Sequence, residues 1–162
     1  EVSRGYGGAV KTGIASCRKE WIFFTDGDGQ FDIAEIPLLL DQAAEADAVV
    51  GYRMDRQDPP HRKLFAFCWG RLIQLLFGFH VKDLDCAFKL FRQRYFDGVE
   101  LKAEGAVITV EIFSILKRNQ ARIKQVGVHH YPRRAGQQSG GNPRVILRAF
   151  KELLKFYKNF KG

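Results

Sequence analysis

The sequence contains little cysteine, and the cysteines that it has form no recognisable pattern. Cys17, Cys68 and Cys86 lack the spacing of a metal-binding motif, and three cysteines leave one over in any disulfide scheme. We therefore expect reduced thiols in a cytosolic setting. Repeats and low-complexity tracts are also lacking, and 46% hydrophobic residues exclude a disordered chain. A chain of 162 residues is long enough for one domain with its own core.

Acidic residues are scarce compared with basic ones. The chain has 18 Asp and Glu residues against 26 Lys and Arg residues, which gives a formal net charge of +8. This balance favours anionic partners, namely nucleic acid, phosphorylated small molecules or an acidic membrane surface. However, aromatic residues do not alternate with Lys and Arg along a strand, as they do on platforms for single-stranded nucleic acid. We expect no nucleic-acid partner and keep a basic nucleic-acid-binding module as the alternative from another class of function.

The start of the chain lacks an initiator methionine and a visible signal peptide. Residues 1–10, EVSRGYGGAV, have the character of a segment from within a fold. We therefore expect an N-terminally truncated part of a longer protein.

Helix and strand patterns alternate in the first third of the chain. The pattern predicts a helix over 8–18, a buried strand over 21–25 and a second buried strand over 48–52. Between the strands, Asp32 followed by Glu35 is typical of a helix start, and this helix is expected to run to about residue 45. The alternation predicts an α/β fold with a mixed, mainly parallel sheet and flanking helices, in which ligands lie beyond the carboxyl ends of strands.

The later part of the chain continues with loops, helices and one further alternating strand. Its elements are predicted as a polar loop over 53–63, an apolar segment over 64–81, a turn and short strand over 83–96, an amphipathic helix over 109–119, a strand over 122–128, a polar loop over 129–142 and a basic helix over 143–160. Pro59 and Pro60 exclude a helix from the first of these loops, because proline lacks an N–H group and restricts the residue before it.

Two aspartates, Asp26 and Asp28, follow the first predicted strand and are separated by one glycine. An EF-hand is one alternative, because Glu35 falls at position 12 of such a loop when Asp28 is at position 5. Phe24 then stands where the first ligand is needed, and a strand precedes the loop instead of a helix, which disfavours an EF-hand. A phosphatase of the haloacid-dehalogenase type also has Asp-x-Asp after a strand, but no downstream acidic pair completes its metal site.

A metal site for a nucleotide-sugar fits the same turn better. A divalent cation there bridges the diphosphate and stabilises its charge as it departs. Asp26, Asp28 and Gln30 offer oxygen ligands of the kind that Mg²⁺ and Mn²⁺ prefer. A plain polar turn that caps the next helix would need only Asp32, so it does not account for the aspartate pair.

Five stretches of the chain together carry a family resemblance. They are RGYGGAVKTGI (4–14), TDGDGQFD (25–32), GYR (51–53), KDLDCAFKLFR (82–92) and HYPRRAGQQSGG (130–141). In this order the chain resembles the family 2 glycosyltransferases of GT-A fold, particularly the polyprenyl-phosphate, dolichol-phosphate mannose synthase-like branch. It departs from the family pattern at Tyr52, where serine is common, and at Ala87, where glycine is usual. The resemblance implies that 1–142 form the C-terminal two-thirds of a GT-A catalytic domain without its first strands, followed by a basic, membrane-proximal helix over 143–162.

The resemblance also implies roles for individual residues. Asp28 would bind the metal, Asp26 would bind the metal or face the ribose, and Gln30 would face the acceptor. Asp83 would line the acceptor side of the sugar pocket or act as a base, although a phosphate acceptor is already ionised at pH 7 and needs little proton removal. Arg133 and Arg134 would clamp the diphosphate as their loop closes and excludes water.

Several further candidates rest on residue type and position. Gly5, Gly7 and Gly8 before a helix allow the backbone to approach a phosphate or base, or simply allow tight packing. Basic residues of the proline-containing loop could bind an acceptor phosphate, or could form a solvated loop; they are Arg53, His61, Arg62 and Lys63. Glu111 is a weaker candidate whose simplest interpretation is a surface glutamate, and His129 and His130 are expected at a strand end.

The apolar segment 64–81 is close to the length of a membrane span, but Gly70, Arg71 and Gln74 interrupt it. It is therefore expected to be a core helix or an interfacial helix that lies on a bilayer. The lysines of the last predicted helix favour attachment to anionic lipid; they are Lys151, Lys155, Lys158 and Lys161. We expect a location at the cytoplasmic face of a membrane, with peripheral attachment or anchoring through parts outside this chain.

The predicted activity is metal-dependent transfer of a hexose from a nucleotide diphosphate-sugar to a polyprenyl phosphate, with inversion at the anomeric carbon. Transfer to a saccharide or protein acceptor is an alternative, and it would require a true base. A catalytically inactive fragment is a further alternative.

Overall fold

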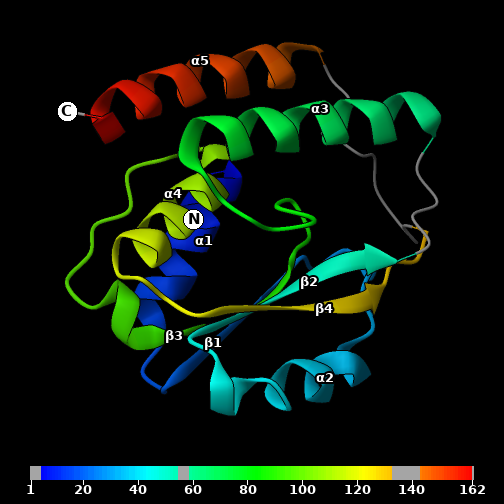
Figure 1. Cartoon of the computed structure of the whole chain (residues 1–162), viewed down its shortest axis with the longest axis vertical. Coiled ribbons are helices and arrows are strands. Elements are labelled where there is room, and N and C mark those ends of the chain that lie inside the picture. Colours follow the sequence, from blue (N-terminus) through cyan, green and yellow to red (C-terminus); the bar gives the residue numbers. More distant parts are fainter. Residues whose placement is uncertain (1–4, 55–58, 133–142, 162) are drawn as a thin grey trace.

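The computed structural model describes residues 5–54, 59–132 and 143–161. Its main elements are α1 (Gly5–Ser16), β1 (Trp21–Thr25), α2 (Ile36–Leu40), β2 (Ala48–Met54), α3 (Pro60–Phe77), β3 (Phe88–Arg92), α4 (Val107–Arg118), β4 (Ile123–His129) and α5 (Pro143–Lys161). Three short 3₁₀ turns lie between them, namely Ile33–Glu35, Ala43–Glu45 and Gln93–Phe96. The sheet lies between α2 on one face and the other helices on the opposite face (Figure 1).

The four strands form one mixed sheet in the order β1-β3-β2-β4. β2 and β4 are parallel, with Met54 opposite His129, whereas β3 runs antiparallel to both β1 and β2. The predicted α/β class and mixed sheet are confirmed. Parallel pairing is less prevalent among the described strands than the alternating pattern suggested, because the chain reaches β3 from the edge where β1 and β2 end.

Side chains alternate between two hydrophobic layers, as the strand geometry requires. Ala48 and Val50 of β2 pack into the larger core with α1, α3, α4 and α5, whereas Val49 between them packs into the smaller core under α2. In β3, Phe88 and Leu90 face the α2 layer. The next residue, Phe91, is buried in the larger core. Both faces of the sheet are therefore covered, which explains why these strands read as nearly continuous apolar runs.

The segment between β1 and β2 is less helical than expected. In place of one helix to residue 45, it forms two 3₁₀ turns around the five-residue helix α2. The Asp32 carboxylate accepts a hydrogen bond from the backbone N–H of Ala34 at 2.9 Å, as a cap should. The Glu35 carboxylate does not complete a capping box, because it accepts the backbone N–H of His129 at 2.9 Å.

The expectation that the two prolines exclude helix as far as residue 63 is wrong at its end. Helix α3 begins at Pro60, where the missing N–H group of proline would be unpaired in any case. The carbonyl of Pro59 accepts the N–H groups of Arg62 at 3.0 Å and Lys63 at 3.1 Å. At the other end, Gly78 stops the helix with φ of +66° and donates its N–H to the Gln74 carbonyl at 2.7 Å.

Helices α3 and α5 lie side by side on the far side of α1 and α4 from the sheet (Figure 1). Trp69 of α3 contacts Phe150 of α5 edge to face, with ring centroids 5.1 Å apart. Phe77 contacts Tyr157 and Phe160 edge to face as well, and its ring lies tilted against that of Phe156. The basic C-terminal helix is thus packed onto α3 through its aromatic side.

The apolar segment 64–81 has one buried and one exposed side. Trp69, Ile73 and Phe77 are buried, so the expectation of a core helix is confirmed for this side. Leu64, Phe67 and Leu75 are at least 64% exposed on the other side. No helix within the described ranges is both long enough and apolar enough to cross a membrane.

Candidate active site at one edge of the sheet

The sheet topology brings four chain segments together at one edge. β1, β2 and β4 end there and the antiparallel β3 begins there, since Thr25 pairs with Phe88 and Met54 with His129. The acidic turn after β1, Arg53 near the end of β2, the turn 83–87 before β3 and His129 at the end of β4 therefore share this edge. Ligand sites in α/β sheets form at such an edge.

The acidic turn has a defined shape. The Asp28 side chain accepts the backbone N–H of Gln30 at 3.0 Å, and Gly29 between them has φ of +73°, which glycine adopts without strain. Asp26 and Asp28 are half-buried. Two carboxylates fit the donor set of Mg²⁺ or Mn²⁺, which commonly take one or two carboxylates together with substrate phosphates. Within the described residues, no group of three or more His, Cys, Asp or Glu side chains is placed to form a metal cage.

Gln30 ties this turn to the end of β4. Its side-chain amide donates to the Tyr131 carbonyl at 3.1 Å, and its own carbonyl accepts the Tyr131 N–H at 2.8 Å. Gln30 is only 7% exposed. The Gln30 side chain is therefore buried in a contact between the two loops, and its expected place on the acceptor side stays a prediction.

Tyr6 and Asp85 lie near the acidic turn, and sequence analysis did not select either of them. The hydroxyl of Tyr6 hydrogen-bonds Thr109. Packing around this hydroxyl, then the negative charges of Asp26 and Asp85, raise the pKa of Tyr6. Asp85 stands in the quoted stretch KDLDCAFKLFR, two residues after Asp83, so the second acidic residue of that stretch was the available signal.

Arg53 and Asp83, predicted as separate site residues, form one ion pair. Arg53 donates from Nε to Asp83 Oδ2 at 2.6 Å and from Nη2 to Oδ1 at 2.7 Å. The backbone N–H of Arg53 also donates to Oδ2 at 3.3 Å. Burial opposes the positive charge of Arg53, but the hydrogen bonds and the charge of Asp83 outweigh it and raise the pKa of Arg53. Arg53 is therefore a permanent cation that is already neutralised by a carboxylate.

A cavity of about 430 Å³ opens beside this pair, between α3 and the loop before β3. Its ionisable lining is mainly basic, with Arg53, Lys63, Arg71 and Lys82 against Asp83 and Asp85. Its apolar lining includes Ala66, Phe67, Val81 and Leu84. Lys63, one of the candidates for binding an acceptor phosphate, lines the cavity, whereas Arg62 is half-buried in the first turn of α3. The arrangement suits an anion that carries an apolar chain.

Loop 78–87, which forms one wall of the cavity, is fixed from three sides. Gln74 of α3 donates to the Val81 carbonyl at 2.7 Å, and Gln125 of β4 accepts the Lys82 N–H at 2.7 Å. From β3, the fully buried Lys89 donates a hydrogen bond to the Cys86 carbonyl. Burial lowers the pKa of Lys89 and raises the pKa of the Cys86 thiol to about 11, so this cysteine is not a reactive thiolate.

The glycines at the start of α1 lie in two different surroundings. Gly7 is a packing position, because an added Cβ would lie 2.1 Å from the Glu104 carbonyl oxygen. Gly5 and Gly8 line a second, open cavity of about 1350 Å³ beside α1. The structure does not bring these two glycines into the cavity that contains Arg53.

Other predicted residues have different surroundings. Glu111 is not a surface residue: it is 8% exposed, and its carboxylate accepts the backbone N–H groups of Lys102 and Ala103 at 2.8–3.0 Å. His129 is at a strand end, as expected, and its ring contacts the Glu35 carboxylate. Arg133 and Arg134 lie outside the described residues.

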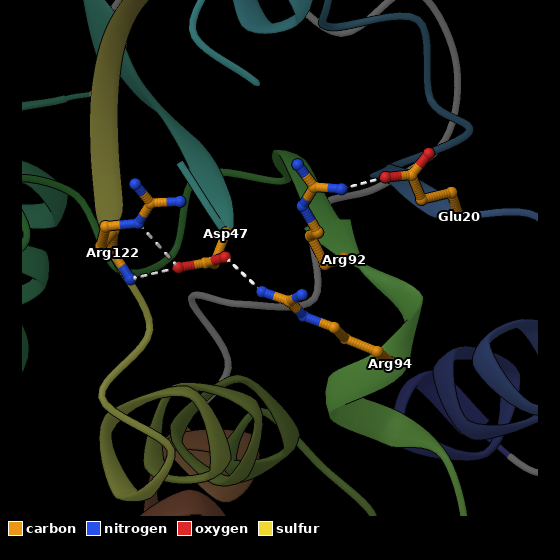
Figure 2. Close-up of polar contacts among 5 residues, drawn as sticks. All are labelled: Glu20, Asp47, Arg92, Arg94 and Arg122. Carbon is orange, nitrogen blue, oxygen red and sulfur yellow. Dashed lines mark hydrogen bonds and ion pairs between the residues drawn. The ribbon is translucent and has the colours of Figure 1, made fainter. Parts of the chain in front are cut away.

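A second polar cluster lies at the opposite edge of the sheet and has a structural role (Figure 2). Asp47, which is 4% exposed, accepts hydrogen bonds from Arg122 Nε at 3.2 Å, the Arg122 backbone N–H at 3.0 Å and Arg94 at 2.7 Å. Burial alone would raise the pKa of Asp47, but the hydrogen bonds and charge of Arg122 and the charge of Arg94 hold it below its ordinary value. Beside it, Arg92 stacks on Trp21 and pairs with Glu20.

Comparison with known protein sequences places this geometry in context. A family model described as glycosyl transferase family 2 matches residues 1–99. The dodecaprenyl-phosphate galacturonate synthase of Rhizobium johnstonii is 29% identical over all of this chain and 49% of its own length. The undecaprenyl-phosphate 4-deoxy-4-formamido-L-arabinose transferase of Pseudomonas fluorescens is 28% identical over 92% of this chain and 44% of its own length. The chain thus spans about half the length of the curated relatives that it matches.

Solved structures show the fold at lower sequence similarity. The glucosyl-3-phosphoglycerate synthase of Mycobacterium tuberculosis in complex with phosphoglyceric acid has a TM-score of 0.68 and 15% identity, over 96% of this chain and 56% of that one. A second structure of that synthase has a TM-score of 0.60 and 15% identity, over 93% and 54%. The GT-A fold that the five sequence stretches implied is confirmed.

Proposed function

Because the chain belongs to glycosyl transferase family 2, we propose that the whole protein transfers a hexose from a nucleotide diphosphate-sugar to a polyprenyl phosphate. One observation supports the proposal above all others. The acidic turn and the basic, partly apolar cavity lie at the same edge of the sheet, so a charged donor and a lipid-phosphate acceptor could meet there. The names of the two curated relatives, both of which include a polyprenyl phosphate, agree with this acceptor.

On the donor side, Asp28 and Asp26 would hold Mg²⁺ or Mn²⁺. The bound ion would supply charge stabilisation to the diphosphate as it leaves. The Asx-type turn at Gly29 fixes the direction of the Asp28 carboxylate, and the Gln30–Tyr131 contact holds the turn against β4. Arg133 and Arg134 are proposed to bind the same diphosphate.

On the acceptor side, the phosphate would enter the cavity lined by Arg53, Lys63, Arg71 and Lys82. Phe67 and Leu84 would contact the first carbons of the lipid chain. A phosphate monoester is mostly ionised at pH 7, so its oxygen needs no general base to become a nucleophile. Attack on the anomeric carbon from the side opposite the diphosphate inverts that carbon.

The outer sides of α3 and α5 are proposed to contact the lipid surface. On α3, an exposed stripe at helical spacing consists of Leu64, Phe67, Arg71 and Leu75. On α5, a second exposed stripe consists of Leu147, Lys151, Leu154 and Lys158. Neither stripe contains an acidic residue, and exposed apolar side chains with basic neighbours are found on helices that lie on anionic bilayers. We therefore propose that the protein acts at the cytoplasmic face of a membrane, where anionic lipid is enriched.

The test uses the full-length protein purified in detergent, with undecaprenyl phosphate and a panel of nucleotide diphosphate-sugars. Formation of sugar-linked lipid is measured by mass spectrometry, and nucleotide release is measured in parallel. Asp28→Ala is expected to reduce product at least about a hundredfold, because one metal ligand is lost. Asp41→Ala, at an exposed position after α2, is the matched control and should leave the rate unchanged. Equal rates for the Asp28 variant and wild type would contradict the metal site, whereas transfer to saccharides alone would contradict the lipid acceptor.

A further inference from the structure

The geometry of the Arg53–Asp83 pair points to a role for Asp83 other than that of a base. Both carboxylate oxygens of Asp83 accept N–H groups of Arg53, and the two side chains are 12% and 14% exposed. A proton taken from an acceptor would neutralise Asp83 and weaken its hydrogen bonds to a permanent cation in a poorly solvated place. The pair is thus built to hold a fixed arrangement.

The planar guanidinium of Arg53 has two edges that can each bind an anion through two hydrogen bonds, and Asp83 binds one of them. It occupies the edge formed by Nε and Nη2. Arginine has five N–H donors, so the edge formed by Nη1 and Nη2 keeps donors for a second anion. Within the described residues, the hydrogen bonds of the Arg53 side chain all go to Asp83. The second edge is therefore the part of Arg53 that a ligand could use.

The surroundings indicate what that ligand would be. Arg53 is neutralised by Asp83, yet Lys63, Arg71 and Lys82 still outnumber Asp85 in the cavity lining. The cavity therefore keeps a net positive charge while its apolar walls exclude water from part of the surface. A phosphate attached to an isoprenoid chain combines the two properties that these walls recognise.

We propose that Asp83 is a positioning residue, which fixes the guanidinium of Arg53 so that its second edge binds the phosphate of the lipid acceptor. This inference rests on the proposed function and gives it a specific geometry. Without Asp83, the Arg53 side chain would regain rotamer freedom, and each binding event would have to order it again. Lysine at position 53 could not replace arginine, because a single ammonium group cannot bind a carboxylate and a phosphate through two parallel pairs of hydrogen bonds.

The test measures binding of farnesyl phosphate, a short isoprenoid monophosphate, to the full-length protein by isothermal titration calorimetry. Asp83→Asn is expected to weaken binding about tenfold, and Arg53→Lys by a similar factor. Asp41→Asn, exposed after α2, is the matched control and should bind as wild type does. In the transfer reaction, Asp83→Asn should raise KM for the lipid more than it lowers kcat. A base would instead show a fall in kcat and loss of the acidic limb of the pH–rate profile.

A double-mutant cycle separates positioning from a general structural role. If Asp83 acts through Arg53, Asp83→Asn should have no further effect on binding in an Arg53→Ala background. Arg53→Gln takes the place of Arg53→Ala if the latter does not fold. Additive effects in the cycle, or wild-type binding by Asp83→Asn, would overturn the inference. Failure of the wild-type protein to bind farnesyl phosphate at all would instead overturn the proposed acceptor.

Discussion

Replacement of Asp47 should destabilise the protein without affecting its site, because Asp47 lies at the opposite edge of the sheet. The buried Asp47 carboxylate accepts hydrogen bonds from the Arg122 backbone N–H, from Arg122 Nε and from Arg94 (Figure 2). These contacts join the starts of β2 and β4 to the turn after β3. Removal of the carboxylate leaves the part-buried backbone N–H of Arg122 without this partner.

The size of the effect follows from the exposure of each partner. The Arg94 and Arg122 side chains are 63% and 64% exposed, so solvent screens their pairs and each contributes only about 0.2–1 kcal/mol. The hydrogen bond from the Arg122 backbone to a buried carboxylate contributes about 1.5–3 kcal/mol. We therefore expect Asp47→Ala to lower the free energy of unfolding by roughly 2–5 kcal/mol. Asp47→Asn should lose about half as much, because its oxygen still accepts the backbone N–H.

The same residue gives a pH dependence with a definite sign. The folded-state pKa of Asp47 lies below the ordinary value of 3.8. Its stabilising contribution is therefore fully present above about pH 4 and is lost as the pH falls through the lower, folded-state pKa. Asp47→Asn should consequently lose less stability than wild type between pH 5 and pH 2.

The assay is urea unfolding of the full-length protein, followed by circular dichroism at several pH values. Asp41→Ala, at an exposed position, is the control and should change the midpoint little. Binding of farnesyl phosphate by folded Asp47→Ala should equal that of wild type. A free energy of unfolding within about 0.5 kcal/mol of wild type for Asp47→Ala would refute the reasoning, since surface substitutions produce changes of that size.

Two further predictions concern packing and membrane contact. Gly7→Ala should destabilise the protein by about 1–3 kcal/mol, because its Cβ would lie 2.1 Å from the Glu104 carbonyl oxygen. Gly13→Ala in the same helix is the control and should not destabilise it, because no atom lies within 4 Å of the added Cβ. Thermal melting distinguishes the two variants, and equal melting temperatures would contradict the packing role of Gly7. Leu154→Gln with Lys151→Gln should reduce flotation with vesicles that contain anionic lipid, whereas Leu38→Gln on α2 should not; unchanged flotation would contradict the proposed lipid-facing stripe.

Much of the fold could be predicted from local patterns. The strands before Asp26 and Arg53 are short apolar runs, and the acidic turn follows the first of them directly, so its place at a strand's carboxyl end was visible in the sequence. The antiparallel direction of β3 was not visible, because it depends on the path of the segment between α3 and β3, and that path is set by the whole fold. The start of α3 at Pro60 differs from the predicted loop, because proline breaks the interior of a helix but is favourable in its first turn.

Predictions about single site residues were limited by contacts between distant parts of the chain. Arg53 and Asp83 are thirty positions apart and were assigned separate roles, yet they form one bidentate pair. Glu111 looked like a surface residue because its partners, the N–H groups of Lys102 and Ala103, belong to the backbone and carry no sequence signal. Gln30 likewise binds the backbone of Tyr131. Residue type alone therefore indicated candidate site residues but did not show which of their side chains pair with other parts of the chain.

The measurement that tests the central claim most directly is lipid-linked sugar formation by the wild-type full-length protein, with and without undecaprenyl phosphate and with Mg²⁺ or excess EDTA. The account predicts product only when both the lipid phosphate and the metal are present, because the acidic turn serves the donor and the neighbouring cavity serves the acceptor. Equal product formation in EDTA, or a rate of donor turnover that does not depend on the lipid phosphate, would contradict the account.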